Sequence, residues 1–264
     1  MPLIHEGPNR RLRQPWIVYA VVLCCTIVLI LTRSDLHSAV HSFGYSPRGD
    51  AFPGMLTSLF LHANFFHLLG NMLFLYIFGD NVEDVLGSFR FAGAFLLAGL
   101  CGNLGYHLVH LQSPTMAIGA SGAVSGIMGL YYLLFPAVRS QLTLTGSGQR
   151  VTIPMSMPWA LSIWFGYQAF LMIILEFDNT IPVAFSAHVA GFLAGMGMGW
   201  LARKRGLLDQ HRLRLVREKT THKEVICPAC YHETPAAGYG RYVCSHCRTE
   251  FLFERTGIRI LNQF

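Results

Sequence analysis

The sequence predicts an all-α membrane protein, a bundle of six transmembrane helices with a small cysteine-rich tail. Of its 264 residues, 52% are hydrophobic and 13% are charged, whereas soluble domains have about 25% charged residues. The charges are also unevenly placed, because five long stretches contain no Asp, Glu, Lys or Arg. Two Cys-x-x-Cys motifs follow the last of these stretches. We therefore expect the apolar stretches to lie in a bilayer and the motifs to form a separate module.

The charge-free stretches define the individual helices. A membrane-spanning helix needs about 20 predominantly apolar residues. The stretch 91–138 is too long for one helix and is divided at Gln112-Ser113-Pro114. The first span is not expected to be a cleaved signal peptide, because no small-residue cleavage site follows it before Arg33. The six expected spans are residues 16–32, 57–78, 91–111, 115–137, 156–177 and 181–202.

The positions of Lys and Arg predict the orientation. All twenty of these residues except Arg33 and Arg48 lie in the amino terminus, the tail or the loops on the same side as the two termini. Lys and Arg are enriched on the cytoplasmic side of membrane proteins. We therefore expect an integral protein of a bacterial-type plasma membrane with both termini in the cytoplasm. The net charge of +6 reflects this asymmetry and gives no reason to expect a nucleic-acid partner.

Changes in composition divide the chain into four parts. We expect a basic cytosolic leader (1–14), the helical bundle (15–202), a basic linker (203–222) and a small cysteine module (223–264). Small residues let membrane helices approach closely, and glycines recur in the fourth and sixth spans. The glycines expected to pack helices together are Gly119, Gly122, Gly126, Gly129, Gly191, Gly195, Gly197 and Gly199.

Polar side chains inside the spans indicate a reactive site, because such residues are costly in lipid and face the bundle interior or a water-filled cavity. Ser121 lies six residues into the fourth expected span and His188 seven residues into the sixth. At a rise of 1.5 Å per residue, both would lie about 9 to 10 Å below the external face. In the second span, His67 and Asn71 are four residues apart and share one helical face.

These residue types suit nucleophilic catalysis. A serine hydroxyl needs an adjacent base, and histidine titrates in the right range. Attack on an amide creates a negative oxygen, which Asn71, His67 and the Ser121 backbone N–H would stabilise. With no carboxylate expected at this depth, the pair would be Ser121 and His188 alone. The alternatives are structural: small residues around a serine are common in packed helices, a lone histidine is often structural, and Asn71 could tie two helices together.

Three segments together resemble the rhomboid family of intramembrane serine proteases. They are FLHANFFHLLGNM in the second span, GASG (119–122) in the fourth and AHVAGFLAG (187–195) in the sixth, and FGDNVEDVLGSFRF (78–91) is also similar. The resemblance covers residues 15–202 and implies a rhomboid-like six-helix bundle. The roles it implies are nucleophile for Ser121, general base for His188, oxyanion hole for His67, Asn71 and the Ser121 N–H, and site lining for His62 and Gly119.

The resemblance also implies an activity and a class of partner. The family cleaves single-pass membrane proteins in or beside their transmembrane helices, without a metal or cofactor, and the fifth span would be a candidate lateral gate. A helix shields its peptide carbonyls until it unwinds. We therefore expect substrates with unstable transmembrane helices, containing Gly, Pro or other helix breakers near the cut.

Two positions depart from the family pattern. DAFPGMLT stands where some rhomboids carry a Trp-Arg pair, and Ser125 stands where some place an aromatic ring on the base. Neither departure removes a reacting group. One alternative is a catalytically silent rhomboid-like protein that binds membrane clients, with the tail as an adaptor. Another is a small channel or transporter, which the expected absence of carboxylates within the spans and the grouping of polar residues toward one side disfavour. His110 and Glu176 are both expected at the membrane interface.

The tail contains the pairs CPAC (227–230) and CSHC (244–247). Four thiolates from Cys227, Cys230, Cys244 and Cys247 at this spacing predict a structural zinc-ribbon-like site, with iron as the alternative metal. A reducing cytosol disfavours disulfides. We expect residues 238–240 to form the turn of a hairpin between the two pairs. Because a module of about 30 residues builds little core, the metal would supply most of its folding free energy, and its role would be contact with a protein partner or regulation.

Overall fold

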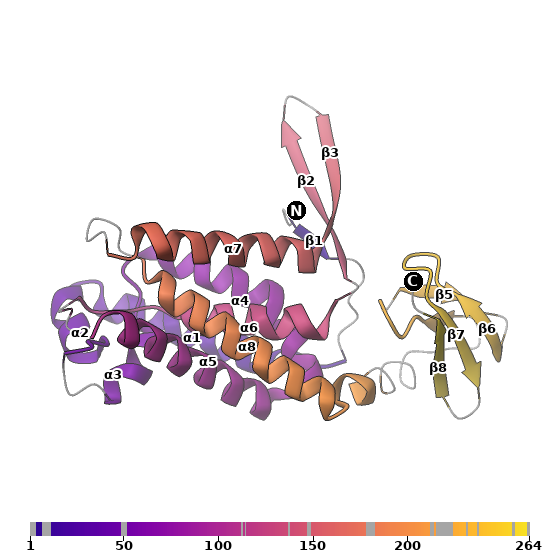
Figure 1. Ribbon diagram of the computed structural model, residues 1–264, viewed down its shortest axis with the longest axis horizontal. Helices are drawn as coiled ribbons and strands as arrows, with labels where there is room; N and C mark the ends of the chain where they lie inside the picture. Colours follow the sequence, from indigo (N-terminus) through magenta and orange to yellow (C-terminus); the bar gives the residue numbers. More distant parts are fainter. Residues whose placement is uncertain are drawn as a thin grey trace. The chain divides into compact units, whose positions relative to one another are not determined.

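The computed structural model of the chain is mostly helical and forms two compact units (Figure 1). The larger unit comprises residues 13–134 and 162–202, and the smaller one comprises 1–12, 135–161 and 203–264. Parts of the expected leader and linker, and Gln112 and Pro114 at the expected break, lie outside the described residues. The structure describes residues 4–6, 12–48, 52–111, 113, 115–136, 138–146, 149–177, 183–211, 214, 224–230, 232–236, 238–254 and 257–262.

Each expected span overlaps at least one helix. The helices are α1 (Trp16–Thr32), α2 (Leu36–Phe43), α3 (Phe52–Thr57), the 3₁₀ turn η1 (Ser58–Phe60), α4 (Phe65–Leu86), α5 (Ser88–Val109), α6 (Ser121–Leu134), α7 (Met157–Leu175) and α8 (Phe185–Lys204). Of the described helices, α5, α7 and α8 are long and apolar enough to cross a membrane, and the bent pair 53–60 and α4 would make a fourth. The helices α1 and α6 are shorter, with 17 and 14 residues. Six spans therefore remain a prediction.

The helices α4, α6 and α8 begin at least four residues later than expected, and for α4 and α6 the reasons are local. The helix α4 begins at Phe65 because the Asn64 side chain caps it, accepting a hydrogen bond of 2.9 Å from the His67 N–H. The segment before α6 is extended because Ala117 forms an antiparallel bridge with Tyr45. Ser121 is therefore the first residue of α6 and does not lie six residues into a helix. The helical rise used to calculate its depth therefore does not apply to the extended residues before it, and the depth itself stays a prediction.

Close backbone contacts hold α6 in the middle of the bundle, where it contacts α4, α5 and α8 (Figure 1). A Cβ on Gly191 would overlap the carbonyl oxygen of Gly122, and one on Gly195 would overlap that of Gly126. The α6–α8 contact therefore requires glycine, as expected for packed membrane helices. The prediction is wrong for Gly197, where a Cβ would meet no atom within 4 Å.

A buried carboxylate fixes the other end of the bundle. Glu83 of α4 is 2% exposed and accepts hydrogen bonds from the Ile17 and Val18 N–H groups at 3.1 and 3.0 Å and from the Ser88 hydroxyl at 2.7 Å. The first N–H groups of a helix have no partner within the helix and carry partial positive charge. Glu83 therefore stabilises the start of α1 and joins it to α4 and α5.

The smaller unit contains β structure that the all-α expectation missed. Strands β1 (Ile4–Glu6), β2 (Arg139–Gly146) and β3 (Gln149–Ser156) form an antiparallel sheet in the order β1-β2-β3. The β2–β3 register runs from Arg139 opposite Ser156 to Gly146 opposite Gln149. The alternation of Leu and Thr in β2 is the period-2 pattern of a strand. The expectation of an entirely helical bundle is therefore wrong for 139–156.

The tail consists of two β units. Strands β4 (Glu224–Ile226) and β5 (Glu233–Pro235) pair with each other, and β6 (Gly240–Val243), β7 (Glu250–Glu254) and β8 (Gly257–Asn262) form a second antiparallel sheet. The two Cys-x-x-Cys motifs lie in the turns of β4–β5 and β6–β7. Residues 238–240 therefore connect two sheets, and the hairpin turn expected there is wrong.

Candidate active site and cysteine cluster

The larger unit contains a cavity of about 1180 Å³ bounded by α4, α5, α6, α7 and α8. Among its lining residues are four that the sequence predicted: Ser121, His188, His67 and Asn71. Other polar side chains also line it, among them His110, Gln168 and Glu176. Polar side chains that lie between positions 67 and 188 of the sequence thus meet at one cavity of the bundle.

The α4 wall of this cavity presents two hydrogen-bond donors. The Nδ1 of His67 accepts a hydrogen bond of 3.4 Å from the Ala63 N–H, so the ring proton lies on Nε2. Asn71 is 8% exposed, and its Nδ2 has no hydrogen-bond partner within the described part of the chain. A Cβ on Gly119 would lie 2.8 Å from His67 Nε2 and 3.7 Å from Asn71 Nδ2. Both donors therefore lie beside Gly119, two residues before Ser121.

Gly119 is suited to this position by its conformation as well as its size. Its φ of +116° is one that side chains rarely allow, and its N–H donates to the Ser58 carbonyl at 2.9 Å. His62, the other residue expected to line the site, is fully buried, with its ring 5.1 Å from that of His67. His62 therefore packs against His67 and limits the positions that the His67 ring can adopt.

Ser121 occupies the amino terminus of α6. The bond from the Val124 N–H to the Ala120 carbonyl, at 2.8 Å, is the first of the helix. The N–H groups of residues 121–123 therefore have no partner within the helix and give this end partial positive charge. A negative oxygen bound here would meet backbone donors from α6 and side-chain donors from α4.

The α6–α8 contact brings His188 toward Ser121. A Cβ on Gly122 would lie 3.4 Å from the carbonyl oxygen of Ala187, and these two residues adjoin Ser121 and His188. The described atoms include no Ser121–His188 hydrogen bond; instead, His188 Nδ1 lies 2.8 Å from Oε1 of Gln168. Catalytic hydrogen bonds are often long without substrate and tighten when it binds. Sequence analysis missed Gln168, although it is a polar residue in an apolar span, the signal that identified the other four.

A second polar cluster lies where α7 ends and α8 begins. Glu176 is 7% exposed, and its carboxylate accepts hydrogen bonds from the Ser186 hydroxyl and, at 3.0 Å, the Ser186 N–H. His110 Nδ1 lies 3.7 Å from the same carboxylate, and the His110 ring stacks on Tyr106 with centroids 4.2 Å apart. Both side chains are therefore largely buried, and Glu176 brings a carboxylate to the cavity lining; that they lie at the depth of the membrane interface stays a prediction.

Comparison with known proteins identifies the family of the helical part. The family model described as the Rhomboid domain matches residues 50–205. The chain belongs to the rhomboid family. Together with its apolar helices, this makes it an integral membrane protein.

Curated relatives of this rhomboid include plant and protozoan proteins. It is 35% identical over 157 residues to "Rhomboid-like protein 11, chloroplastic" of Arabidopsis thaliana, covering 56% of this chain and 52% of that protein. It is 28% identical to "RHOMBOID-like protein 5" of the same plant, covering 56% and 43%. It is 28% identical over 193 residues to "Rhomboid-like protease 1" of Toxoplasma gondii, covering 72% and 61%. The chain spans between 43% and 61% of the length of these relatives.

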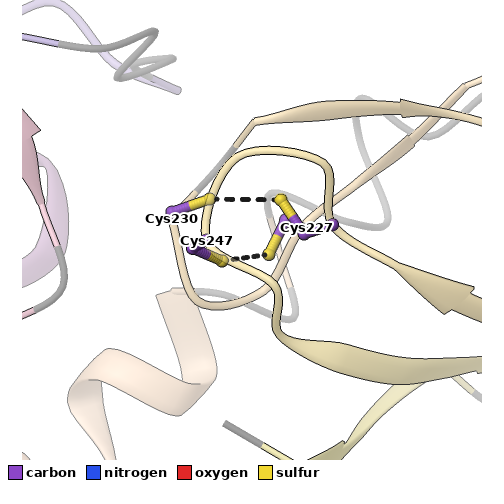
Figure 2. Close-up of side chains that lie close together, drawn as sticks. Cys227, Cys230 and Cys247 are labelled. Carbon is purple, nitrogen blue, oxygen red and sulfur yellow. Dashed lines mark hydrogen bonds between the residues drawn. The ribbon is translucent and has the colours of Figure 1, made fainter. Parts of the chain in front are cut away.

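The rhomboid's tail brings the four cysteines together. Figure 2 shows the sulfur atoms of Cys227, Cys230 and Cys247 directed toward a common centre. The Cys227–Cys247 and Cys230–Cys244 sulfur atoms are 3.6 and 3.5 Å apart, and all four lie within 4.8 Å of one another. Each motif also makes the same backbone bond of 2.9 Å, from its first cysteine to the carbonyl five residues later. A family model described as a domain of unknown function (DUF8512) matches residues 225–260.

The geometry of this cluster fits a tetrahedral metal ion. Four sulfur atoms at about 2.3 Å from zinc lie about 3.8 Å from one another, whereas a disulfide requires a separation of about 2.05 Å. The observed spacings therefore match ligands of one ion, and all four thiols are free. Hydrogen bonds from the neighbouring thiols, with Cys227 the largest contributor, raise the pKa of Cys230 together with burial. A cation would be needed to stabilise four thiolates at this distance.

Proposed function

We propose that this rhomboid is an intramembrane serine endopeptidase with Ser121 as nucleophile and His188 as general base. The observation that carries the proposal is the buried Asn71 amide, whose Nδ2 lacks a partner in the described structure and lies beside His67 and Gly119. An unpaired buried donor costs about 1 to 3 kcal/mol. It is readily explained as a group kept for an oxygen that appears only during reaction.

In the proposed first step, Ser121 Oγ attacks the substrate carbonyl while its proton moves to Nε2 of His188. The Oγ–C bond forms, and the carbonyl electrons move to the oxygen. Asn71 Nδ2, His67 Nε2 and the Ser121 N–H donate hydrogen bonds to that oxygen. Collapse of the intermediate breaks the peptide C–N bond, and His188 returns its proton to the leaving amine.

In the second step, water entering the cavity hydrolyses the acyl-enzyme. His188 takes a proton from the water as it attacks, the same donors hold the new negative oxygen, and the proton passes to Ser121 Oγ as the ester breaks. The chemistry uses no metal. We propose that water arrives from the external face, since hydrolysis consumes it and lipid does not supply it.

We propose that all six apolar helices lie within the membrane, with both termini cytoplasmic and a bacterial-type plasma membrane as the location. The proposed organisation is a basic leader (1–14), protease domain (15–202), basic linker (203–222) and metal module (223–264). The helix α6 is shorter than a usual membrane span, but most of its residues are buried. Because they are covered by protein and not by lipid, α6 can lie within the membrane without matching the full thickness of the bilayer.

For the tail we propose structural zinc bound by Cys227, Cys230, Cys244 and Cys247. The support is the spacing of the four sulfur atoms and the repetition of one turn geometry around them. Two short sheets with a small core leave the metal to supply most of the folding free energy. The module would contact a protein partner and take no part in hydrolysis.

Labelling with a fluorophosphonate probe tests the proposed activity. We expect labelling of the wild type and none of Ser121→Ala, with His188→Ala slowed by about 10³-fold or more. Ser162→Ala is the control, because Ser162 is an exposed serine of α7 that does not line the cavity. Absence of wild-type labelling in folded protein would instead favour the silent, client-binding alternative.

Substrate helices of graded stability test the proposed specificity. Glycine weakens a helix by about 1 kcal/mol per residue relative to alanine, and a substrate must unwind to expose its carbonyl. A reconstituted substrate with Gly or Pro near the cut should be cleaved much faster than the same substrate with a polyleucine segment. Equal rates would contradict the requirement for unwinding.

A further inference from the structure

Two partners of the His188 ring lie on α7, and a third, Phe185 of α8, has its ring centroid 6.4 Å away. Gln168 Oε1 lies 2.8 Å from His188 Nδ1, and the Trp164 ring lies 6.4 Å from the imidazole at an interplanar angle of 31°. Trp164 and Gln168 are four residues apart and therefore share one face of α7. Ser125, one turn after Ser121, instead donates its hydroxyl proton to the Ser121 carbonyl at 2.7 Å.

The bond to Gln168 determines which imidazole nitrogen carries the proton. A side-chain amide oxygen only accepts hydrogen bonds, so Nδ1 of His188 must donate. In a neutral imidazole the other nitrogen, Nε2, then holds the lone pair. This is the tautomer that a base needs if it is to take a proton through Nε2, and without Gln168 nothing in the described structure selects it.

The rest of α7 is held in the register that this bond requires. Glu176, immediately after α7, accepts the Ser186 N–H of α8 at 3.0 Å, two residues before His188. Phe165 stacks on Phe192 of α8, with ring centroids 4.7 Å apart and an interplanar angle of 24°. Contacts on both sides of Gln168 therefore hold α7 against α8.

We propose that Gln168 is a positioning residue that completes the Ser121–His188 pair as a neutral third member, an inference that rests on the proposed protease activity. It fixes the orientation and tautomer of His188, the part that a carboxylate takes in three-residue hydrolase sites. Trp164 packs on the same ring, so α7 supplies the aromatic contact that Ser125 on α6 lacks. Unlike a carboxylate, the neutral amide adds no charge to stabilise the imidazolium.

Three variants of the full-length protein test this role through the pH dependence of fluorophosphonate labelling. Gln168→Met keeps the size of the side chain but cannot accept the hydrogen bond from His188. It should slow labelling by about 10-fold to 100-fold, because the productive tautomer is no longer selected. Gln168→Glu restores an acceptor and adds charge that favours the imidazolium. The labelling rate of Gln168→Glu should reach at least that of the wild type at high pH. The acidic limb of its pH–rate profile should move upward by about one pH unit. Tyr167→Met, at an exposed neighbour outside the cavity lining, should match the wild type.

The outcomes distinguish this inference from the function on which it depends. Wild-type labelling at Ser121 with unchanged labelling of Gln168→Met would overturn the inference and leave the protease proposal intact. Labelling could instead be slowed in Gln168→Met while folded Gln168→Glu shows neither a recovered rate nor a shifted pH profile. Gln168 would then act through packing alone, and the inference would also be overturned. If Gln168→Met does not fold, the position of the acidic limb in the pH profile of Gln168→Glu still tests the inference. Cleavage kinetics should show the Gln168→Met loss in kcat with little change in KM.

Discussion

The cavity of the bundle and the cysteine cluster of the tail are two polar sites held together in opposite ways. The cluster takes its ligands from two local motifs, residues 227–230 and 244–247, each placed by its own hairpin turn. The cavity takes its polar groups from helices far apart in sequence, and what unites them is backbone contact such as that between Gly122 and Gly191. The first site would be held together by an ion and the second is held together by packing.

This difference determines where each region is vulnerable. In the tail, removing one ligand should unfold the region, because little else holds it. In the bundle, single polar side chains can change without loss of fold, whereas an added methyl group at a helix contact has no space. The predictions below test this contrast, beginning with the largest expected effect.

Enlarging Gly195 should abolish the fold of the bundle. In Gly195→Val the new side chain would overlap the Gly126 carbonyl, which is backbone and cannot move aside. Overpacking typically costs about 1 to 3 kcal/mol where side chains can adjust, so we expect a larger loss here, seen as absence of a thermal transition and of probe labelling. Gly197→Val, two residues along the same helix, meets nothing within 4 Å and should behave as the wild type. Equal stability of the two variants would contradict the packing account.

Removing one cysteine should unfold the tail and leave the cavity working. Cys227→Ser replaces a thiolate ligand with a hydroxyl, and metal binding supplies most of the folding free energy of such modules. Hydrogen exchange over residues 224–262 should rise to the unprotected level, with loss of about one bound zinc per chain. Probe labelling at Ser121 should stay within about twofold of the wild type. The matched control is Cys24→Ser, at an exposed thiol outside the cluster; a large fall in labelling in Cys227→Ser alone would couple the two regions.

The sequence predicted the tail more completely than the bundle, and the reason is physical. Ligand spacing in a turn is local, so CPAC and CSHC were enough to predict that the four sulfur atoms converge. The hairpin turn expected at residues 238–240 was wrong because each cysteine pair already occupies the turn of its own hairpin. Strands β2 and β3 were missed because a charge-free stretch indicates a membrane span and not a strand, whereas the signal for a strand is the period-2 pattern of residues 142–145.

In the bundle, composition predicted the helices but not their ends. The Asn64 cap and the Tyr45–Ala117 bridge depend on a side-chain cap and a distant strand-like contact, and both moved helix starts by several residues. Ser121, His188, His67 and Asn71 were nevertheless brought to one cavity, because a costly polar group in a span faces the interior whatever its depth. The pairing of Glu176 with Ser186 could not be foreseen, since it depends on how α7 meets α8.

Two buried asparagines provide a sharper comparison within the bundle. Asn71→Ala removes a donor without a described partner and should lower the rate of cleavage by about 10²-fold to 10³-fold, with little loss of thermal stability. Asn103 Nδ2 donates to the Met55 carbonyl at 2.7 Å and to the Ser58 hydroxyl at 3.0 Å. Asn103→Ala should therefore cost about 1 to 3 kcal/mol. A stability loss in Asn71→Ala as large as that in Asn103→Ala would indicate a structural role for Asn71 and contradict the proposed oxyanion hole.

The smallest effects are expected at the edge of the metal module. Thr249 is 1% exposed, with its hydroxyl 3.1 Å from the Cys247 sulfur. Removing that contact in Thr249→Val should weaken zinc binding by about 10-fold. Arg241 and Glu250 form a 2.6 Å ion pair in which the arginine hydrogen bond lowers the pKa of Glu250 below 4.5. The Arg241 side chain is 62% exposed, and surface ion pairs contribute little, so Arg241→Ala should leave zinc affinity at pH 7 within about twofold.

Lowering the pH separates the contribution of the Arg241–Glu250 ion pair to the stability of this module from that of the metal. Because the pKa of Glu250 is lowered by folding, any contribution of the pair is present above 4.5 and is lost as pH falls through the lowered value. Zinc should dissociate at higher pH than this, since its ligands are thiolates that take up protons. Competition with a chromophoric chelator from pH 7 to pH 5 should therefore give parallel curves for the wild type and Arg241→Ala, and a curve displaced toward weaker binding for Thr249→Val. A displaced curve for Arg241→Ala would mean that the surface pair, and not the metal alone, holds the β6–β7 hairpin closed.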